Sequence, residues 1–254
     1  MARPFFCGNV LQNGGNGYII RLNKTYIKGV SPMILENQFK ALKTLLSLPE
    51  GFDENKKYPL VVFLHGAGTR CNDLEVLKRN ACFTNLRLHQ DRGFLLAAPL
   101  CEVHDWNEVM ETVIAWIAEL RALPYVDTDR VYLTGNSMGG YGTWELASIH
   151  PEWFAAIMPV CGGGCGGFGA RLKDIPVRTF HGLLDKVVDP IESLQMAKAV
   201  NCFGGHCELI LFPHLEHNCW DTVYTTEENY DWLLSHTLRS SEEKKQNLSG
   251  EIYG

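Results

Sequence analysis

An unbroken apolar run at residues 60–64, LVVFL, followed by the glycine-rich sequence HGAG, constrains the fold of this chain more than any other feature. A strand that faces water on one side alternates apolar and polar residues, so a run without alternation is typical of a strand buried on both faces. Such strands occur in parallel sheets that helices cover on both sides. We therefore expect a parallel sheet at the centre of the molecule.

Further short apolar runs alternate with segments of helical periodicity along the chain. Strands are predicted from the sequences GFLLAAPL, RVYLTG, AAIMPVCG, VRTFHG and CELILFP, with an earlier strand in KALKTLLSLPEGF. Helices are predicted at residues 107–123, 139–148 and 191–202, and in the sequence NYDWLLSHTL. Alternating strands and helices form βαβ units, so the predicted fold class is α/β, with a doubly wound, mostly parallel sheet and helices on both faces.

Composition divides the chain of 254 residues into three parts. Residues 1–35 are rich in glycine and asparagine, and we expect them to form an N-terminal extension or an edge hairpin. Residues 36–238 contain the alternating pattern and are predicted to form the catalytic α/β domain. Residues 239–254 are polar, and we expect this tail to fray.

The net charge and the cysteine content indicate which kinds of partner the protein can bind and in which compartment it is expected. The net charge of −6 comes without the basic block that a nucleic-acid partner requires, and no apolar run is long enough to span a membrane. Nine scattered cysteines without a CxxC pair favour reduced thiols and a cytoplasmic protein. The N-terminus as it stands has no signal-peptide pattern, whereas earlier removal of such a peptide would imply secretion.

Ser137 lies in the sequence GNSMG, residues 135–139, between a predicted strand and a predicted helix. The pattern G-x-S-x-G places the serine on a sharp strand-to-helix turn, where the two glycines avoid clashes with the adjoining elements. The helix that follows points its amide dipoles at the site, which favours developing negative charge. Ser137 is therefore predicted to be a nucleophile, and the alternative is a polar residue in an ordinary turn.

A nucleophilic serine needs a histidine base and a carboxylate that orients the base, in the chain order serine, acid, histidine. His217 follows the apolar strand LILF and is the predicted base, with His214 as its rival. Asp185 follows the strand VRTFHG and is the predicted acid. Asp189 precedes a proline and is typical of a helix N-cap. His181 is interpreted as a structural residue at the end of a strand.

A tetrahedral intermediate needs two N–H donors. One is predicted at the amide of Met138, directly after the nucleophile, and the other at the amide of Ala67, with Gly66 as the next choice. Gly66, Asn136 and Trp106 are predicted to line the substrate cleft. Trp106 has an alternative role, which is to pack beneath the helix that follows it.

The sequences HGAG, GNSMGG, HGLLD and EHNCW occur in the order and spacing of an α/β-hydrolase. Over residues 40–237 the chain resembles the α/β-hydrolase superfamily, and within it the phospholipase/carboxylesterase, dienelactone-hydrolase-like and predicted-peptidase or feruloyl-esterase-like serine esterases. The resemblance implies ester hydrolysis through an acyl-enzyme, with no metal or organic cofactor. Leu100 departs from the pattern, since related sequences often carry glutamine there. Short connections imply a minimal lid.

The resemblance implies small to medium ester substrates, including acetyl or feruloyl esters of plant polysaccharides, so a small-molecule or oligosaccharide ester is the expected partner. A serine peptidase or an acyl-protein thioesterase would use the same triad and is the alternative. A non-catalytic binding protein on this fold is a remote alternative, because such proteins usually lack a triad member. A metal site at His214, His217 and Cys219 is disfavoured, because the triad already accounts for His217. The glycine-rich residues 161–169 are expected to border the cleft or to act as a connector.

Overall fold

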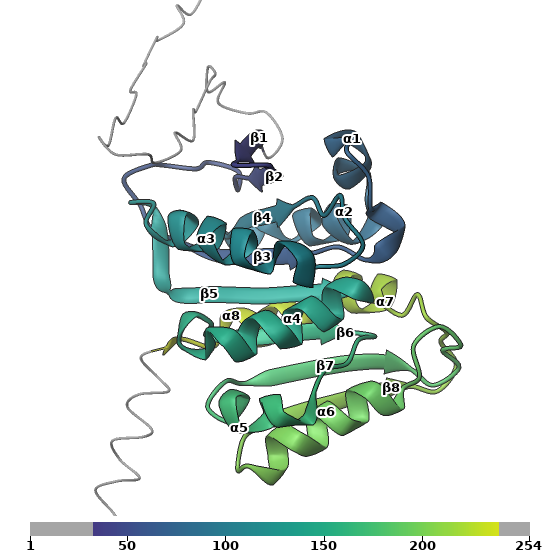
Figure 1. Cartoon of the computed structure of the whole chain (residues 1–254). Helices are drawn as coiled ribbons and strands as arrows, with labels where there is room; N and C mark the ends of the chain where they lie inside the picture. Colours follow the sequence, from purple (N-terminus) through teal and green to yellow (C-terminus); the bar gives the residue numbers. More distant parts are fainter. Residues whose placement is uncertain (1–32, 239–254) are drawn as a thin grey trace, which may run out of the picture.

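The computed structural model describes residues 33–238 and contains one sheet of eight strands, in the order β1-β2-β4-β3-β5-β6-β7-β8 (Figure 1). The strands, in chain order, are β1 (Ile34–Phe39), β2 (Leu42–Ser47), β3 (Tyr58–Leu64), β4 (Leu95–Pro99), β5 (Val126–Asn136), β6 (Ala156–Val160), β7 (Val177–Gly182) and β8 (Cys207–Phe212). The pairs β1–β2 and β2–β4 are antiparallel, and the remaining pairs are parallel. The predicted fold class is confirmed.

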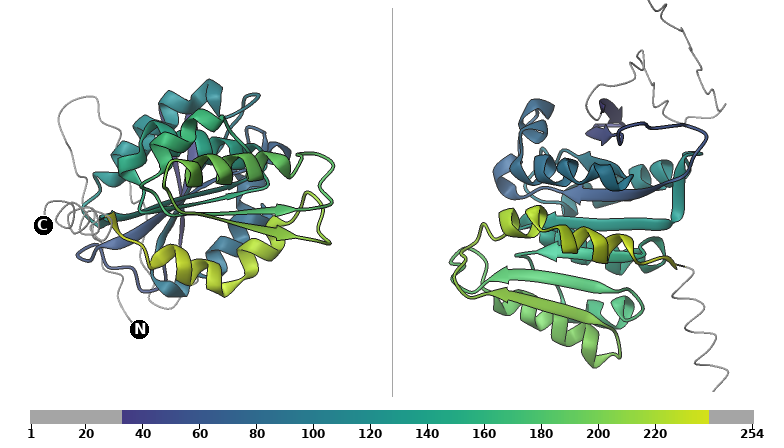
Figure 2. Two further views of the ribbon diagram at one scale, coloured as in Figure 1. Left: turned by 90° about the horizontal axis from the view of Figure 1, so that it is seen from below. Right: turned by 180° about the vertical axis from the view of Figure 1, so that it is seen from behind.

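Helices cover both faces of the sheet (Figures 1 and 2). One face carries α3 (Met110–Arg121), α4 (Met138–Ile149), α5 (Gly169–Leu172) and α6 (Ile191–Cys202). The other face carries α1 (Leu74–Lys78), α2 (Ala81–Leu88), α7 (Trp220–Thr225) and α8 (Glu227–Leu234). Short 3-10 turns complete the connections: η1 (Ala67–Thr69), η2 (Gln90–Arg92), η3 (Asn107–Val109), η4 (Pro151–Trp153) and η5 (Gly166–Phe168).

The central strand β3 shows why the apolar run at residues 60–64 lacks alternation. Leu60, Val62 and Leu64 pack into the hydrophobic core beneath α3, α4 and α6. Val61 and Phe63 point the other way, into the core beneath α2, α7 and α8. All five side chains are 0% exposed, so each residue of the run is buried on one face or the other.

The predicted strands and helices correspond to β2 to β8 and to α3, α4, α6 and α8, with small shifts at their ends. The sequence interpretation missed β1, whose polar residues hide an edge strand, and the short helices α1, α2, α5 and α7. Because β1 begins at Ile34, the folded domain starts before the expected boundary at residue 36. The remainder of the predicted N-terminal extension or hairpin, and the predicted tail at residues 239–254, lie outside the described residues.

The connection from β6 to β7 carries the glycine-rich residues 161–169. It contains only η5 and the four-residue helix α5, so no lid domain is inserted there. Gly162 is buried against α4, because a Cβ at this position would collide with the backbone of Gly140. Residues 165–167 are exposed. The first part of this loop is therefore a close-packed connector.

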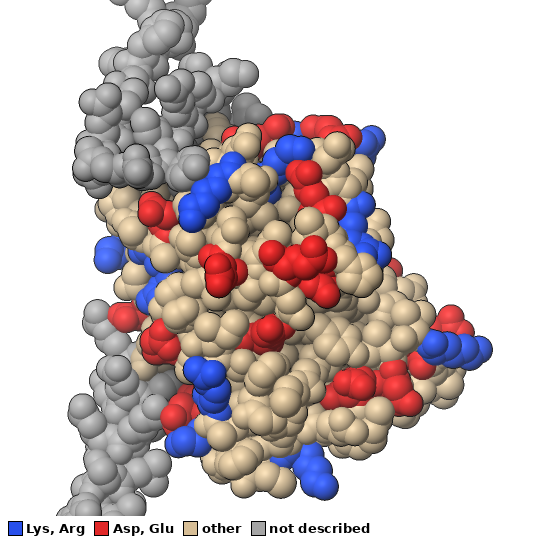
Figure 3. All heavy atoms as spheres, in the orientation of Figure 1, with Lys and Arg blue, Asp and Glu red and all other residues tan. Residues whose placement is uncertain are grey.

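The face that carries α3, α4 and α6 shows acidic and basic side chains interspersed among uncharged ones (Figure 3). No broad basic patch occurs on this face of the described residues. Among residues 33–238, no helix combines the length and apolar character that a bilayer crossing requires.

Candidate active site

Ser137 occupies a strained turn between β5 and α4. Its φ of 56° lies in the left-handed region, which is costly for a residue with a side chain and is found mostly where function requires it. The Ser137 N–H donates to the carbonyl of Val160 at 3.0 Å, which ties the turn to the end of β6. Gly139 is required at its position, since a Cβ there would collide with the carbonyl of Leu64 in β3.

His217 lies on the loop after β8 and contacts Ser137 directly. The distance between His217 Nε2 and Ser137 Oγ is 2.9 Å, which is within reach for proton transfer. The other ring nitrogen, Nδ1, lies 2.6 Å from Oδ2 of Asp185. His217 therefore bridges the serine hydroxyl and a carboxylate, which is the arrangement that activates a serine nucleophile.

Asp185 lies on the loop after β7, and its side chain is fully buried. Its Oδ1 accepts hydrogen bonds from the amides of Val187 and Val188 at 2.8 and 2.9 Å. Burial alone would raise the pKa of this carboxyl group, but the hydrogen bonds from His217, Val188 and Val187 outweigh burial and hold the pKa below its usual value. The carboxylate is therefore charged and available to stabilise a protonated His217.

The two rival residues lie outside this arrangement. His214 is exposed on the loop, three residues before His217. Asp189 is also exposed, and its Oδ1 accepts a hydrogen bond from the amide of Ile191 at 2.9 Å. This contact caps the start of α6, as predicted from the proline that follows Asp189. The structure thus brings together Ser137, Asp185 and His217.

The two predicted oxyanion donors lie at the starts of helices beside Ser137. Met138 is the first residue of α4, and Ala67 is the first residue of the 3-10 turn η1. Within the described residues, neither amide donates to a carbonyl. The preceding Gly66 lies next to the nucleophile, because a Cβ on Gly66 would stand 3.4 Å from the Ser137 Cβ. Both N–H groups are thus unengaged close to the serine.

Two hydrogen bonds to the Gly66 carbonyl fix the orientation of the peptide bond between Gly66 and Ala67. The Gly66 carbonyl accepts hydrogen bonds from Nδ1 of His65 at 2.8 Å and from the amide of Thr69 at 3.1 Å. In a trans peptide the carbonyl and the next N–H point in opposite directions, so these contacts also orient the Ala67 N–H. His65 Nε2 accepts from the Cys101 amide at 3.0 Å, which leaves the ring proton on Nδ1.

Burial keeps the His65 ring neutral. The imidazole is 0% exposed, and desolvation lowers the pKa of His65 from 6.5 to about 4. A neutral ring can donate from Nδ1 while accepting at Nε2, and both of these contacts are present. His65 was not among the predicted site residues, although it is the histidine of the HGAG sequence.

The prediction that Trp106 lines the substrate cleft is wrong. Its ring is 2% exposed and lies in the core beneath α4, against Gly142. The indole Nε1 donates to the carbonyl of His65 at 3.1 Å, so Trp106 supports the turn after β3 from inside. Gly66 and Asn136 are also buried and pack against each other rather than facing a cleft.

Two residues near the triad escaped the sequence interpretation. Tyr141 lies one helical turn after Ser137, and burial, with smaller contributions from the charges of Glu192 and Asp185, raises the pKa of its hydroxyl. Ser193 on α6 is fully buried and contacts His181. Neither residue belongs to a sequence motif, so only the folded arrangement identifies them.

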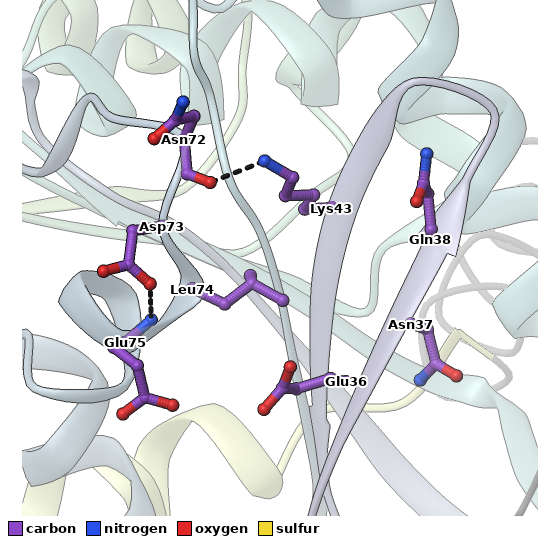
Figure 4. Close-up of a pocket in the computed structure, with 8 residues that line it drawn as sticks. All are labelled: Glu36, Asn37, Gln38, Lys43, Asn72, Asp73, Leu74 and Glu75. Atoms are coloured by element: carbon purple, nitrogen blue, oxygen red, sulfur yellow. Dashed lines mark hydrogen bonds between the residues drawn. The ribbon is translucent and has the colours of Figure 1, made fainter.

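A separate polar hollow of about 530 Å³ lies far from the triad in the sheet order (Figure 4). It is formed by β1, β2, the segment that leads into α1 and the first residues of α1. Its lining residues are Glu36, Asn37, Gln38, Lys43, Asn72, Asp73, Leu74 and Glu75. Lys43 Nζ donates to the Asn72 carbonyl and forms an ion pair with Glu102. The Asp73 carboxylate accepts from the Glu75 amide and so caps the start of α1. Within residues 33–238 no group of three or more His, Cys, Asp or Glu could hold a metal ion.

Comparison with a solved structure identifies the fold family. A structure described as a thermostable esterase matches with a TM-score of 0.70 and 29% sequence identity, covering 82% of this chain and 63% of that chain. This chain belongs to the α/β-hydrolase superfamily. Residues 104–163, which include the turn at Ser137, match the model of the prolyl oligopeptidase family, which is a family of α/β-hydrolases.

Two curated relatives differ in the activity that their names describe. Dipeptidyl-peptidase 5 of Porphyromonas gingivalis is 28% identical over 171 residues, covering 59% of this chain and 24% of that protein. The protein named "Probable feruloyl esterase C" of Aspergillus terreus is 27% identical over 157 residues, covering 60% of this chain and 58% of that protein. The chain thus spans less than two thirds of each relative. The site of this α/β-hydrolase is that of a serine hydrolase, in the group that contains the prolyl oligopeptidase family and the esterases.

Proposed function

We propose that the protein hydrolyses carboxylic esters through an acyl-enzyme formed on Ser137. The observation that carries the proposal is the continuous contact from Ser137 Oγ to His217 Nε2 and from His217 Nδ1 to Asp185, at 2.9 and 2.6 Å. The likeness to an esterase over most of the described domain supports an ester rather than a peptide as the substrate.

The triad carries each proton of the proposed reaction. Ser137 Oγ attacks the ester carbonyl and gives its proton to His217 Nε2, while Asp185 stabilises the imidazolium. The amides of Ala67 and Met138 stabilise the negative oxygen of the tetrahedral intermediate. His217 then returns the proton to the leaving alcohol, which departs and leaves an acyl group on Ser137. Water repeats the sequence and releases the acid.

We expect the substrates to be small to medium esters. Acetyl and feruloyl esters of plant polysaccharides are one candidate class, supported by the feruloyl esterase relative. A connection from β6 to β7 that holds no lid domain is consistent with soluble substrates rather than lipid droplets.

Replacing the nucleophile tests the proposal. Ser137→Ala should lower kcat on 4-nitrophenyl acetate by about 10⁵- to 10⁶-fold, because a triad without its nucleophile leaves only the binding and oxyanion contributions. The wild-type protein should also label with a fluorophosphonate probe, and the variant should not. The matched control is His214→Ala, three residues before His217, which should retain wild-type turnover. Equal ester turnover in the wild-type protein and Ser137→Ala would contradict the assignment.

A serine peptidase is the second candidate, because part of the chain matches the prolyl oligopeptidase family and a dipeptidyl-peptidase. The two activities separate on matched chromogenic substrates. We expect kcat/KM on 4-nitrophenyl acetate and methyl ferulate to exceed kcat/KM on dipeptidyl 4-nitroanilides by at least about 100-fold, a difference of roughly 3 kcal/mol in transition-state binding. The reverse order would favour the peptidase.

A further inference from the structure

His181 contacts the same carboxylate oxygen of the proposed triad as His217, which is Oδ2 of Asp185. It lies in β7, four residues before Asp185, and is 0% exposed. Its Nε2 lies 3.1 Å from Asp185 Oδ2 and 3.0 Å from the carbonyl of Val188. Both of these partners only accept hydrogen bonds, so Nε2 carries a proton and donates it.

The other nitrogen of His181 is also engaged. His181 Nδ1 lies 2.7 Å from the hydroxyl of Ser193 on α6, and that hydroxyl lies 2.8 Å from the carbonyl of Gly162. Ser193 is 0% exposed, so water does not compete for these contacts. The ring of His181 is therefore held at both ends, between α6 and the loop that carries Asp185.

The Asp185 carboxylate has four donors as a result. Oδ1 accepts from the amides of Val187 and Val188, and Oδ2 accepts from both His217 and His181. Rotation of the carboxylate would break several of these contacts, and water could not replace them easily because the Asp185 side chain is 0% exposed. A donor that shares Oδ2 also draws negative charge away from the contact with His217.

We propose that His181 is a positioning residue that acts through Asp185: it holds Oδ2 opposite His217 Nδ1 and limits how strongly that oxygen stabilises the His217 imidazolium. The inference rests on the proposed function, since it assigns a role within the same triad. A purely structural His181 would affect folding alone. A positioning His181 also affects the pH dependence of ester turnover.

Other ionisable groups surround this carboxylate. Tyr141 on α4 and Cys161 after β6 both experience the charge of Asp185, and Glu192 on α6 lies near Tyr141. Burial raises the pKa of the Tyr141 hydroxyl and of the Cys161 thiol, so both groups are neutral at and below pH 7. Their contributions, and that of Glu192, are the same in all variants that change only His181.

The test compares His181→Leu, which has no side-chain donor, with His181→Gln, which has an amide N–H donor. For His181→Leu we expect kcat per fluorophosphonate-labelled site to fall about 10- to 100-fold, because the base is less well placed, with KM changed less than about twofold. The acid limb of kcat/KM should shift upward by about half to one pH unit, since Oδ2 then stabilises the imidazolium more strongly. His181→Gln should restore the wild-type acid limb.

Two outcomes would overturn the proposal. One is a His181→Leu enzyme with wild-type kcat per labelled site and an unshifted acid limb. The other is an unprotonated Nε2 of His181 in the wild-type protein, because the contacts with Asp185 and Val188 require a proton there. NMR of ¹⁵N-histidine-labelled wild-type protein, which should show this proton, measures it even if His181→Leu does not fold. Failure of the wild-type protein to turn over esters or to label at Ser137 would refute the proposed function. The NMR result does not depend on catalysis, so the two failures can be told apart.

Discussion

At the scale of single residues, the site depends on groups that touch no substrate. His65 is the clearest case, because it holds the carbonyl of Gly66 and thereby orients the amide of Ala67. Trp106 in turn supports the carbonyl of His65 from the core. One of the two proposed oxyanion donors thus owes its direction to two buried side chains that lie behind it.

His65 should make the stability of the protein depend on pH. Its pKa is lowered by burial from 6.5 to about 4 in the folded state, so between these values only the unfolded chain binds the proton. The contribution is intact above pH 6.5, falls as the pH decreases, and is lost in full below pH 4. The loss amounts to about 3 kcal/mol in the free energy of unfolding.

Urea denaturation of the wild-type protein and of His65→Gln at pH 7 and pH 4 measures this contribution. Other groups titrate in both proteins, so the difference between the two proteins isolates His65. The decrease in the free energy of unfolding between the two pH values should be about 3 kcal/mol smaller in His65→Gln. An equal decrease in both proteins would show that His65 is not held neutral.

At the scale of elements, the approach of α4 to β3 sets the position of the nucleophile. A Cβ on Gly139 would overlap the backbone carbonyl of Leu64, and backbone cannot move aside as a flexible side chain can. Gly139→Ala should therefore lower the free energy of unfolding by more than about 4 kcal/mol or prevent folding. Gly166→Ala is the matched control, because a Cβ there meets nothing within 4 Å.

Urea denaturation and ester turnover compare these two glycine variants. Gly166→Ala should keep the wild-type midpoint and wild-type kcat. A Gly139→Ala protein with wild-type stability and turnover would mean that the strand-to-helix turn can widen without cost, and the packing argument for the position of Ser137 would fail.

The elements that could be predicted from sequence are those in which a single structural requirement, such as burial on both faces or close packing at a turn, explains the residue pattern. The run in β3 lacks polar residues because both of its faces are buried, and Ser137 is flanked by glycines because the turn is crowded. β1 was missed because ILENQF mixes polar residues into an edge strand, where one side of the ladder faces solvent.

Parts of the site could not be predicted because they depend on how loops fold back. A tryptophan in a connecting segment can face a cleft or the core, and only the contact between Trp106 and the His65 carbonyl decides between them. Likewise, the contact of His181 with Asp185 exists because the amides of Val187 and Val188 turn the carboxylate back towards β7. Sequence spacing alone does not encode that turn.

At the scale of the whole molecule, one sheet joins two hydrophobic cores. β3 contributes Val62 to the core beneath α3, α4 and α6, and Val61 to the core beneath α2, α7 and α8. The triad depends on both faces, because Ser137 leads into α4 on one side and His217 leads into α7 on the other. We therefore expect the two cores to unfold together.

Two substitutions on adjacent residues of β3 test this coupling. Val61→Ala and Val62→Ala each remove two methyl groups from a different core, and each should lower the free energy of unfolding by roughly 2–3 kcal/mol. Because the sheet is shared, each variant should shift the same single urea transition, seen at one midpoint by far-UV circular dichroism, tryptophan fluorescence and loss of ester turnover. Separate midpoints for these probes, or a variant that shifts only one of them, would show that the two cores unfold independently and that the site can be lost while half of the fold persists.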